Sequence, residues 1–158
     1  MILQPLSAEK RAAVEHDCGI LVRLARHVFR REIRYDEESI KWLAWLIEFS
    51  RNKPQEQVKM NLKTSIGCFL GETIIARYGG EWVVTESRDM GVRLPDQTVA
   101  FPFLKVSKQF NNGDADNIWG MFKMGEVLLQ RDSRQFTKVK PIMQLQSEQG
   151  RNDIGKCL

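Results

Sequence analysis

SIGCFLGETIIARYGGEWVV, residues 65–84, changes its hydrophobic period partway along. Up to Tyr78 the apolar residues recur three and four positions apart, as they do on a buried helix. Gly79 and Gly80 follow, and glycine is the residue that most often ends a helix in a left-handed conformation. The last residues, from Trp82 onward, have the composition of a β-strand. Helix, stop and strand together predict a protein of the α+β class.

Three helices are predicted up to this point. The first begins after Ser7, a good capping residue, and runs to about residue 31. The second begins at Asp36 and is apolar over most of its circumference, so we expect it to be the central helix. The third starts with Pro54 in its first turn and ends at the glycine stop. Gly67 and Gly71 lie four apart in it, which predicts the close approach of a neighbouring backbone.

Strand-like segments joined by short turns follow the third helix. Because parallel strands need a long crossover, the short turns predict a small three-stranded antiparallel meander. Two further helices are expected, and Asp114 or Asp116 is expected to cap the last one. We expect a single domain over residues 1–130 and a polar C-terminal tail, partly docked or mobile, over residues 131–158. The predicted strands are residues 81–86, 91–94 and 98–101.

Composition limits the classes of function. The chain has 158 residues, 42% of them hydrophobic, and a net charge of +4, which suits one domain that prefers acidic partners. No segment approaches a membrane span, and the N-terminus does not read as a secretory signal. The cysteines show no paired metal or redox spacing, which favours inert thiols in a reducing cytoplasm. They are Cys18, Cys68 and Cys157.

Catalytic and metal-binding patterns are weak throughout the sequence. His16 and His27 are eleven residues apart, about 16 Å along a helix, so they cannot share one metal ion. The acidic run at 112–117 has its glycine in the wrong place for a calcium loop and is better explained by helix capping. We therefore expect no catalytic residue, no metal site and no cofactor, and a protein that is not an enzyme.

Glu72 is the most suggestive polar residue, since it interrupts an apolar run. If it faces inward it must be paired or neutral, because an isolated buried carboxylate is costly. One hypothesis is a polar pocket where the third helix meets the sheet. The alternative is a structural ion pair, or an exposed position on the helix rim. The residues of the hypothetical pocket are Glu72, Trp82, Arg93, Lys105 and Lys108.

Arginines are dense near the end of the first helix. Arg23, Arg26 and Arg30 share one helical face by their spacing, and Arg34 follows closely. A nucleic-acid surface would interleave such cations with free aromatic rings, whereas the nearby aromatics fit core and capping positions. The pattern favours a solvated face or a contact surface for an acidic protein, and argues against nucleic acid.

Several short motifs resemble the bacterial DUF3806-type domain. They are residues 69–72, 79–84, 91–94, 99–108 and 112–114, within a stretch of about 54–122. Gln109 stands where that family is expected to have Arg, and Gly113-Asp114 replaces its Gly-Glu. The resemblance implies mainly the fold. Small domains of this sort occur beside bacterial toxin genes, which implies by analogy an immunity protein that neutralises a toxin.

The leading hypothesis is thus a cytoplasmic, non-enzymatic protein-binding module, an immunity protein whose toxin partner has an acidic surface. The alternative is a ligand-binding or enzymatic domain built on the pocket around Glu72. A third hypothesis is nucleic-acid binding through the arginine-bearing helix. The sequence names neither the partner nor the oligomeric state.

Overall fold

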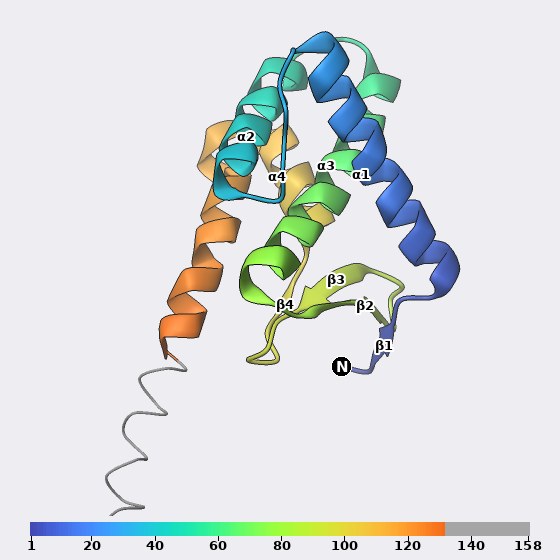
Figure 1. The fold of residues 1–158 in the computed structure, drawn as a ribbon, viewed down its shortest axis with the longest axis vertical. Helices are drawn as coiled ribbons and strands as arrows, with labels where there is room; N and C mark the ends of the chain where they lie inside the picture. The colour runs from blue at the N-terminus through green and yellow to red at the C-terminus, as the bar shows by residue number, and fades with distance from the viewer. Residues whose placement is uncertain (132–158) are drawn as a thin grey trace, which may run out of the picture.

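A four-stranded antiparallel sheet lies at one end of a group of helices in residues 1–131, the part of the chain that this computed structural model describes (Figure 1). The architecture is α+β, as the sequence predicts. Apart from Arg131, which belongs to the last helix, the predicted tail lies outside the described residues. The helices are α1 (Ala8–Val28), α2 (Glu37–Arg51), α3 (Glu56–Tyr78), α4 (Pro102–Asn112), a 3₁₀ turn (Gly113–Asp116) and a C-terminal helix at 118–131.

Side-chain caps define where the helices begin. The Ser7 hydroxyl accepts a hydrogen bond from the backbone N–H of Lys10 at 3.3 Å, and the Asp36 carboxylate accepts one from Ser39 at 2.8 Å. Both predicted caps are confirmed. The cap predicted at Asp114 or Asp116 is wrong, because Asn117 accepts the bond from Trp119 N–H at the start of the C-terminal helix.

The third helix begins two residues later than predicted. Its first residue is Glu56, so Pro54 lies before the helix and not in its first turn. Its end is confirmed at Gly79, which has a φ of 80° and donates its backbone N–H to the Ile75 carbonyl at 2.9 Å.

The sheet contains the three predicted strands and one more. Its order is β1 (Leu3–Pro5), β2 (Glu81–Thr85), β3 (Met90–Arg93) and β4 (Val99–Ala100), with every neighbouring pair antiparallel. The additional strand, β1, pairs with β2 through Leu3 opposite Thr85 and Pro5 opposite Val83. It has only three residues, which is too short for a hydrophobic period to reveal it.

The central helix is α3, not α2 as the sequence suggested. It contacts α1, α2, α4 and β3, and every residue from Ser65 to Gly71 is buried (Figure 1). The outer side of α2 carries exposed rings instead. Small residues explain the difference, since a helix whose circumference includes glycine, serine and cysteine can be surrounded on all sides.

The two glycines of α3 accommodate aromatic rings. A Cβ atom on Gly67 would overlap the ring of Phe103, and one on Gly71 would overlap the ring of Trp82. The two rings lie against each other, with centroids 5.9 Å apart. The predicted close approach therefore exists, but side chains from α4 and β2 make it, and no neighbouring backbone does.

Candidate functional site

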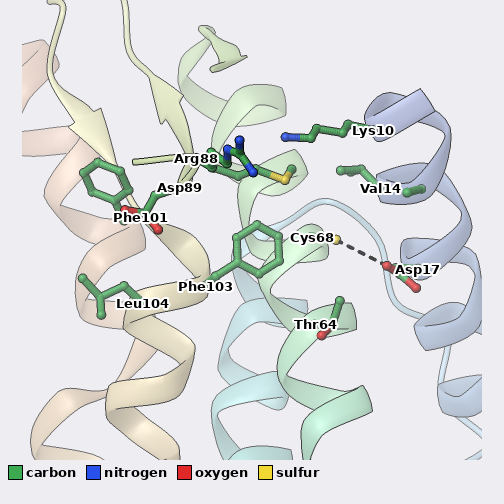
Figure 2. Close-up of a pocket in the computed structure, with 12 residues that line it drawn as sticks. Lys10, Val14, Asp17, Thr64, Cys68, Arg88, Asp89, Phe101, Phe103 and Leu104 are labelled. Carbon is green, nitrogen blue, oxygen red and sulfur yellow. Dashed lines mark hydrogen bonds between the residues drawn. The ribbon is translucent and has the colours of Figure 1, made fainter. Parts of the chain in front are cut away.

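A cavity of about 540 Å³ lies between α1, α3, α4 and the β2–β3 turn (Figure 2). The glycine at 67 helps to shape it, because the Phe103 ring that packs there also lines the cavity. Its remaining lining residues are Lys10, Ala13, Val14, Asp17, Thr64, Cys68, Arg88, Asp89, Met90, Phe101 and Leu104. A cavity of this size is within the range of small-molecule sites.

Two cations lie at the same end of this cavity. The side chains of Lys10 from α1 and Arg88 from the β2–β3 turn point toward one another (Figure 2). Both residues are exposed, and neither forms an ion pair within residues 1–131. Neither residue could be identified as a site residue from the sequence. The sequence predicts a turn between the two strands, but nothing in it indicates that the arginine of this turn faces α1.

Two cysteine thiols are buried. Cys68 lines the cavity, and Cys18 lies in the core. The Cys68 thiol donates a hydrogen bond to an Asp17 carboxylate oxygen at 4.0 Å. Burial is the main cause that raises the pKa of Cys18 to about 12, and burial also raises the pKa of Cys68 well above its usual range. Since the thiolate is the nucleophilic form, both residues behave as small packed hydrophobes, as expected.

Glu72 is paired within the fold. The indole N–H of Trp82 donates to Glu72 Oε1 at 2.7 Å, and Arg11 Nη1 lies 3.7 Å from the same oxygen. The carboxylate side chain is 19% exposed. The contacts of Glu72 therefore fit a structural ion pair better than a polar pocket. Its partner Arg11 was not among the partners considered from the sequence.

The other residues of the hypothetical pocket lie in separate contacts. Arg93 pairs with Glu81, its cross-strand neighbour on β2. Lys105 Nζ lies 3.2 Å from Asp116 Oδ1, and Lys105 and Lys108 together line a second cavity of about 470 Å³ that contains neither Glu72 nor Trp82. The structure thus brings Glu72 and Trp82 together but does not assemble the five residues into one site.

The arginines near the end of α1 are exposed but do not form one helical stripe. Helix α1 ends at Val28, so Arg30 lies beyond it with a φ of 53°, and the spacing argument that included Arg30 is wrong. Arg34 lies in the following loop, where its backbone N–H donates to Ser39 Oγ at 2.9 Å.

Of these four arginines, Arg23 and Arg26 do lie on α1, and one of the two is already paired. Arg26 makes two hydrogen bonds to the Glu32 carboxylate, at 2.7 and 3.0 Å, and this pair keeps the pKa of Glu32 below its usual value. The guanidinium of Arg23 folds back toward Gly19. Neither arginine is part of a concentrated cationic patch.

A group of apolar side chains, three of them exposed and two half-buried, lies beside these arginines. We call it the aromatic surface, and it consists of Val28, Phe29, Trp42, Trp45 and Phe49. Trp45 is 47% and Phe49 is 48% exposed, and their rings stack with centroids 5.2 Å apart. Phe29 packs edge-on against Trp42 at 5.4 Å. The sequence analysis missed this surface, although the i, i+3, i+7 spacing of the α2 aromatics indicates a second apolar face.

Cations and a groove accompany the aromatic surface. Lys53 Nζ lies 4.4 Å from the centroid of Phe49, and the Arg31 guanidinium lies 5.6 Å from that of Trp42. A groove of about 370 Å³ continues the surface between the ends of α1 and α2 and the start of α3. Its lining includes Phe49, Lys53 and Val58.

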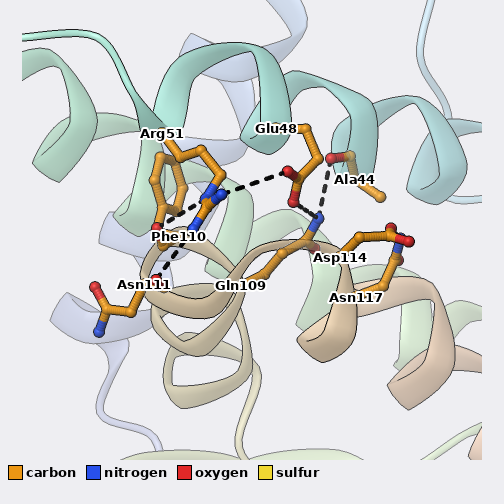
Figure 3. A network of polar contacts seen from close by, with 8 residues as sticks. All are labelled: Ala44, Glu48, Arg51, Gln109, Phe110, Asn111, Asp114 and Asn117. Carbon is orange, nitrogen blue, oxygen red and sulfur yellow. Dashed lines mark hydrogen bonds and ion pairs between the residues drawn. The ribbon is translucent and has the colours of Figure 1, made fainter.

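A polar network connects α2 to α4 (Figure 3) and extends to the first residue of the C-terminal helix. Gln109 is 0% exposed, and its amide N–H groups donate to the Ala44 carbonyl and to Glu48 Oε1, both at 3.1 Å. Its oxygen accepts from the Ile118 N–H at 2.9 Å. Arg51 donates to the carbonyl of Phe110 at the end of α4. Gln109, where the resembling family is expected to have Arg, is thus a structural residue.

Comparison with family models gave no match, and comparison with curated proteins and with solved structures gave none either. The resemblance to the DUF3806-type domain therefore stays a prediction. Within residues 1–131, no group of three His, Cys, Asp or Glu side chains could hold a metal ion. No helix in this part of the chain is long and apolar enough to cross a membrane.

Proposed function

We propose that this chain is a protein-binding module that recognises an acidic protein through the aromatic surface. The observation that carries the proposal is the stacked pair of Trp45 and Phe49, each about half exposed on the outer side of α2. Tryptophan dominates binding energy at protein interfaces, and a contiguous exposed apolar patch marks an interaction site more often than a single exposed residue does.

The groove beside the aromatic surface gives the interface its anchor. An interface hot spot forms where a large side chain enters a pocket from which water is excluded. The groove is bounded by Phe49 and Val58, so an apolar side chain of the partner would fill it. Lys53 also lines it, and its charge favours acidic residues around that apolar anchor.

A protein fits this surface better than a nucleic acid does. Single-stranded nucleic acids bind by stacking bases on open aromatic faces. Here Trp45 and Phe49 stack on each other, and Lys53 covers Phe49. The chain's net charge of +4 favours an acidic protein partner.

The partner we favour is a toxin, with the chain acting as its immunity protein in the cytoplasm. Support for this step comes from the resemblance to DUF3806-type domains and from their occurrence beside bacterial toxin genes. The geometry supports the protein-binding step itself. A basic inhibitor suits an acidic toxin surface and would suit the basic cleft of a nuclease poorly.

The test is a binding titration between the purified chain and the product of the gene adjacent to its own. Calorimetry with the wild type and with a Trp45→Ala/Phe49→Ala variant would measure the change in Kd. We expect the double variant to weaken binding by about a hundredfold or more, since two hot-spot side chains are removed. Leu104→Ala is the matched control, because Leu104 is exposed and apolar but belongs to α4.

Three outcomes would contradict the proposal. One is an unchanged Kd for the double variant, and another is an equal loss for Leu104→Ala. The third is tight binding of a single-stranded oligonucleotide whose affinity falls steeply with salt and depends on Trp45. Sedimentation of the free chain is a further check, since a dimer abolished by the double variant would make this surface a self-contact.

A further inference from the structure

We propose that the cavity between α1, α3, α4 and the β2–β3 turn binds an amphipathic monocarboxylate, with the carboxylate held by Lys10 and Arg88. The two cationic side chains point toward each other at one end of an otherwise largely apolar cavity of about 540 Å³ (Figure 2). This site is separate from the aromatic surface and does not depend on the protein-binding role.

Arg88 occupies a backbone position that disfavours it. In the β2–β3 hairpin its N–H donates to the Thr85 carbonyl at 2.9 Å, and Thr85 N–H donates to the Asp89 carbonyl at 2.9 Å. Arg88 has a φ of 67°. Hairpins of this kind usually have glycine at that left-handed position, which is sterically unfavourable for a residue with a Cβ. Strain of this sort gathers at functional sites.

The strained turn directs the Arg88 guanidinium toward the Lys10 ammonium (Figure 2). Within residues 1–131 neither Lys10 nor Arg88 forms an ion pair. Two like charges that face one another repel, and an anion between them removes that cost. The planar guanidinium matches a carboxylate with two parallel hydrogen bonds, and a lysine ammonium adds a third donor.

The rest of the cavity selects an apolar body. Val14, Phe101, Phe103 and Leu104 line it, and the Phe103 ring is fixed in place against Gly67. These walls would cover an aliphatic chain or an aromatic ring of a bound ligand, and each methylene removed from water strengthens binding. A ligand with only a charged group would gain nothing from them.

Two acidic residues restrict the ligand to a single negative charge. Asp17 is seven residues after Lys10 on α1, about 10 Å along the helix, and Asp89 also lines the cavity. A second anionic group at the far end of a ligand would meet the Asp17 carboxylate and be repelled. A monocarboxylate with an apolar tail places its charge at the cations and its tail between the acids and the aromatic walls.

The test is calorimetric titration of the full chain with decanoate, and with decan-1-ol and the ten-carbon dicarboxylate sebacate as probes of the same length. We expect decanoate to bind at least tenfold more tightly than either. Arg88→Gly is the decisive variant, because glycine suits the left-handed position. It is expected to lose at least tenfold in decanoate affinity while its melting temperature is equal to or above that of the wild type.

Matched variants distinguish the effect of the two cations in the cavity from the effect of the net charge of the chain. Arg23→Ala removes one positive charge outside the cavity and should leave decanoate affinity unchanged, whereas Lys10→Ala should weaken it. The Trp45→Ala/Phe49→Ala variant should also bind decanoate normally. Equal binding of decan-1-ol, or full affinity in Arg88→Gly, would overturn the proposal. A lowered melting temperature in Arg88→Gly would make Arg88 a structural residue and would overturn it as well.

Discussion

Helices α2 and α3 are both rich in apolar residues, yet one lies at the surface and the other at the centre. The outer side of α2 exposes Trp45 and Phe49, while α3 buries an unbroken run from Ser65 to Gly71. Apolar content is therefore a poor guide to centrality. Residue size decides it, because small side chains leave room for neighbours on every side, and large rings at i, i+3 and i+7 form a face of their own.

Thiol labelling is expected to show the largest contrast, between the outer side of α2 and two buried thiols, Cys68 on α3 and Cys18 on α1. In a Cys157→Ser background, Cys18 and Cys68 should react with iodoacetamide at pH 8 far more slowly than an exposed thiol. A pKa of about 12 for Cys18, against an ordinary 9.0, leaves about a thousandfold less thiolate. A cysteine placed on α2 by Trp45→Cys should label at the ordinary rate.

The pH dependence of this labelling follows from the direction of the shift. Because burial raises the pKa of both native thiols, their labelling should stay slow up to pH 10, whereas the labelling rate of the thiol at position 45 should reach about half its maximum near pH 9. Rapid labelling of Cys68 in the folded protein at pH 8 would mean that α3 is not enclosed.

Substitution of a glycine in α3 tests directly whether small residues allow neighbours to surround this helix. Gly71→Ala would place a Cβ inside the ring of Trp82, so we expect a loss of about 3 kcal/mol in the free energy of unfolding, measured in urea. Gly120→Ala is the matched control, since no atom lies within 4 Å of its Cβ position, and a gain of about 0.5 kcal/mol is expected there. Similar effects at both sites would refute the argument.

Substitution of Gln109 tests whether polar contacts hold α2 against α4. Gln109→Leu keeps the volume but leaves the Ala44 carbonyl and the Ile118 N–H without their partner. We expect a loss of about 2 kcal/mol in the free energy of unfolding. Gln57→Leu, on the exposed start of α3, should change it by less than about 0.5 kcal/mol. If Gln109→Leu were neutral, the hydrogen bonds of Gln109 would contribute nothing to the attachment of α2.

The smallest loss in the free energy of unfolding is expected for a substitution on the outer side of α2. Trp45→Ser should lower the free energy of unfolding by about 1 kcal/mol, because nearly half of the residue is already exposed to water. Urea unfolding monitored by circular dichroism would measure it. A loss near 3 kcal/mol would place Trp45 in the core and remove the basis for the aromatic surface.

Local patterns in the sequence predicted the elements well. The helical period, the caps at Ser7 and Asp36 and the glycine stop at Gly79 are set by neighbouring residues, so they could be recognised without a structure. The α+β class followed from them. Strand β1 could not be found in this way, because its pairing with β2 joins residues about 80 positions apart.

The candidate sites were harder to predict, since distant residues create them. Glu72 was correctly singled out as a residue that needs a partner, but no spacing indicated Arg11. The cavity depends on Lys10 and Arg88, which the fold alone brings together. The aromatic surface was overlooked because an apolar helix was equated with a buried one.

The short strands at both ends of the sheet also bear on how the protein behaves at high concentration. An edge strand offers unpaired N–H and C=O groups to other chains, and long flat edges promote aggregation. Here β1 has three residues and ends in Pro5, which has no N–H to donate, and β4 has only two. The sheet thus presents almost no template on which a second copy could add a strand, so overexpressed protein should resist fibril formation.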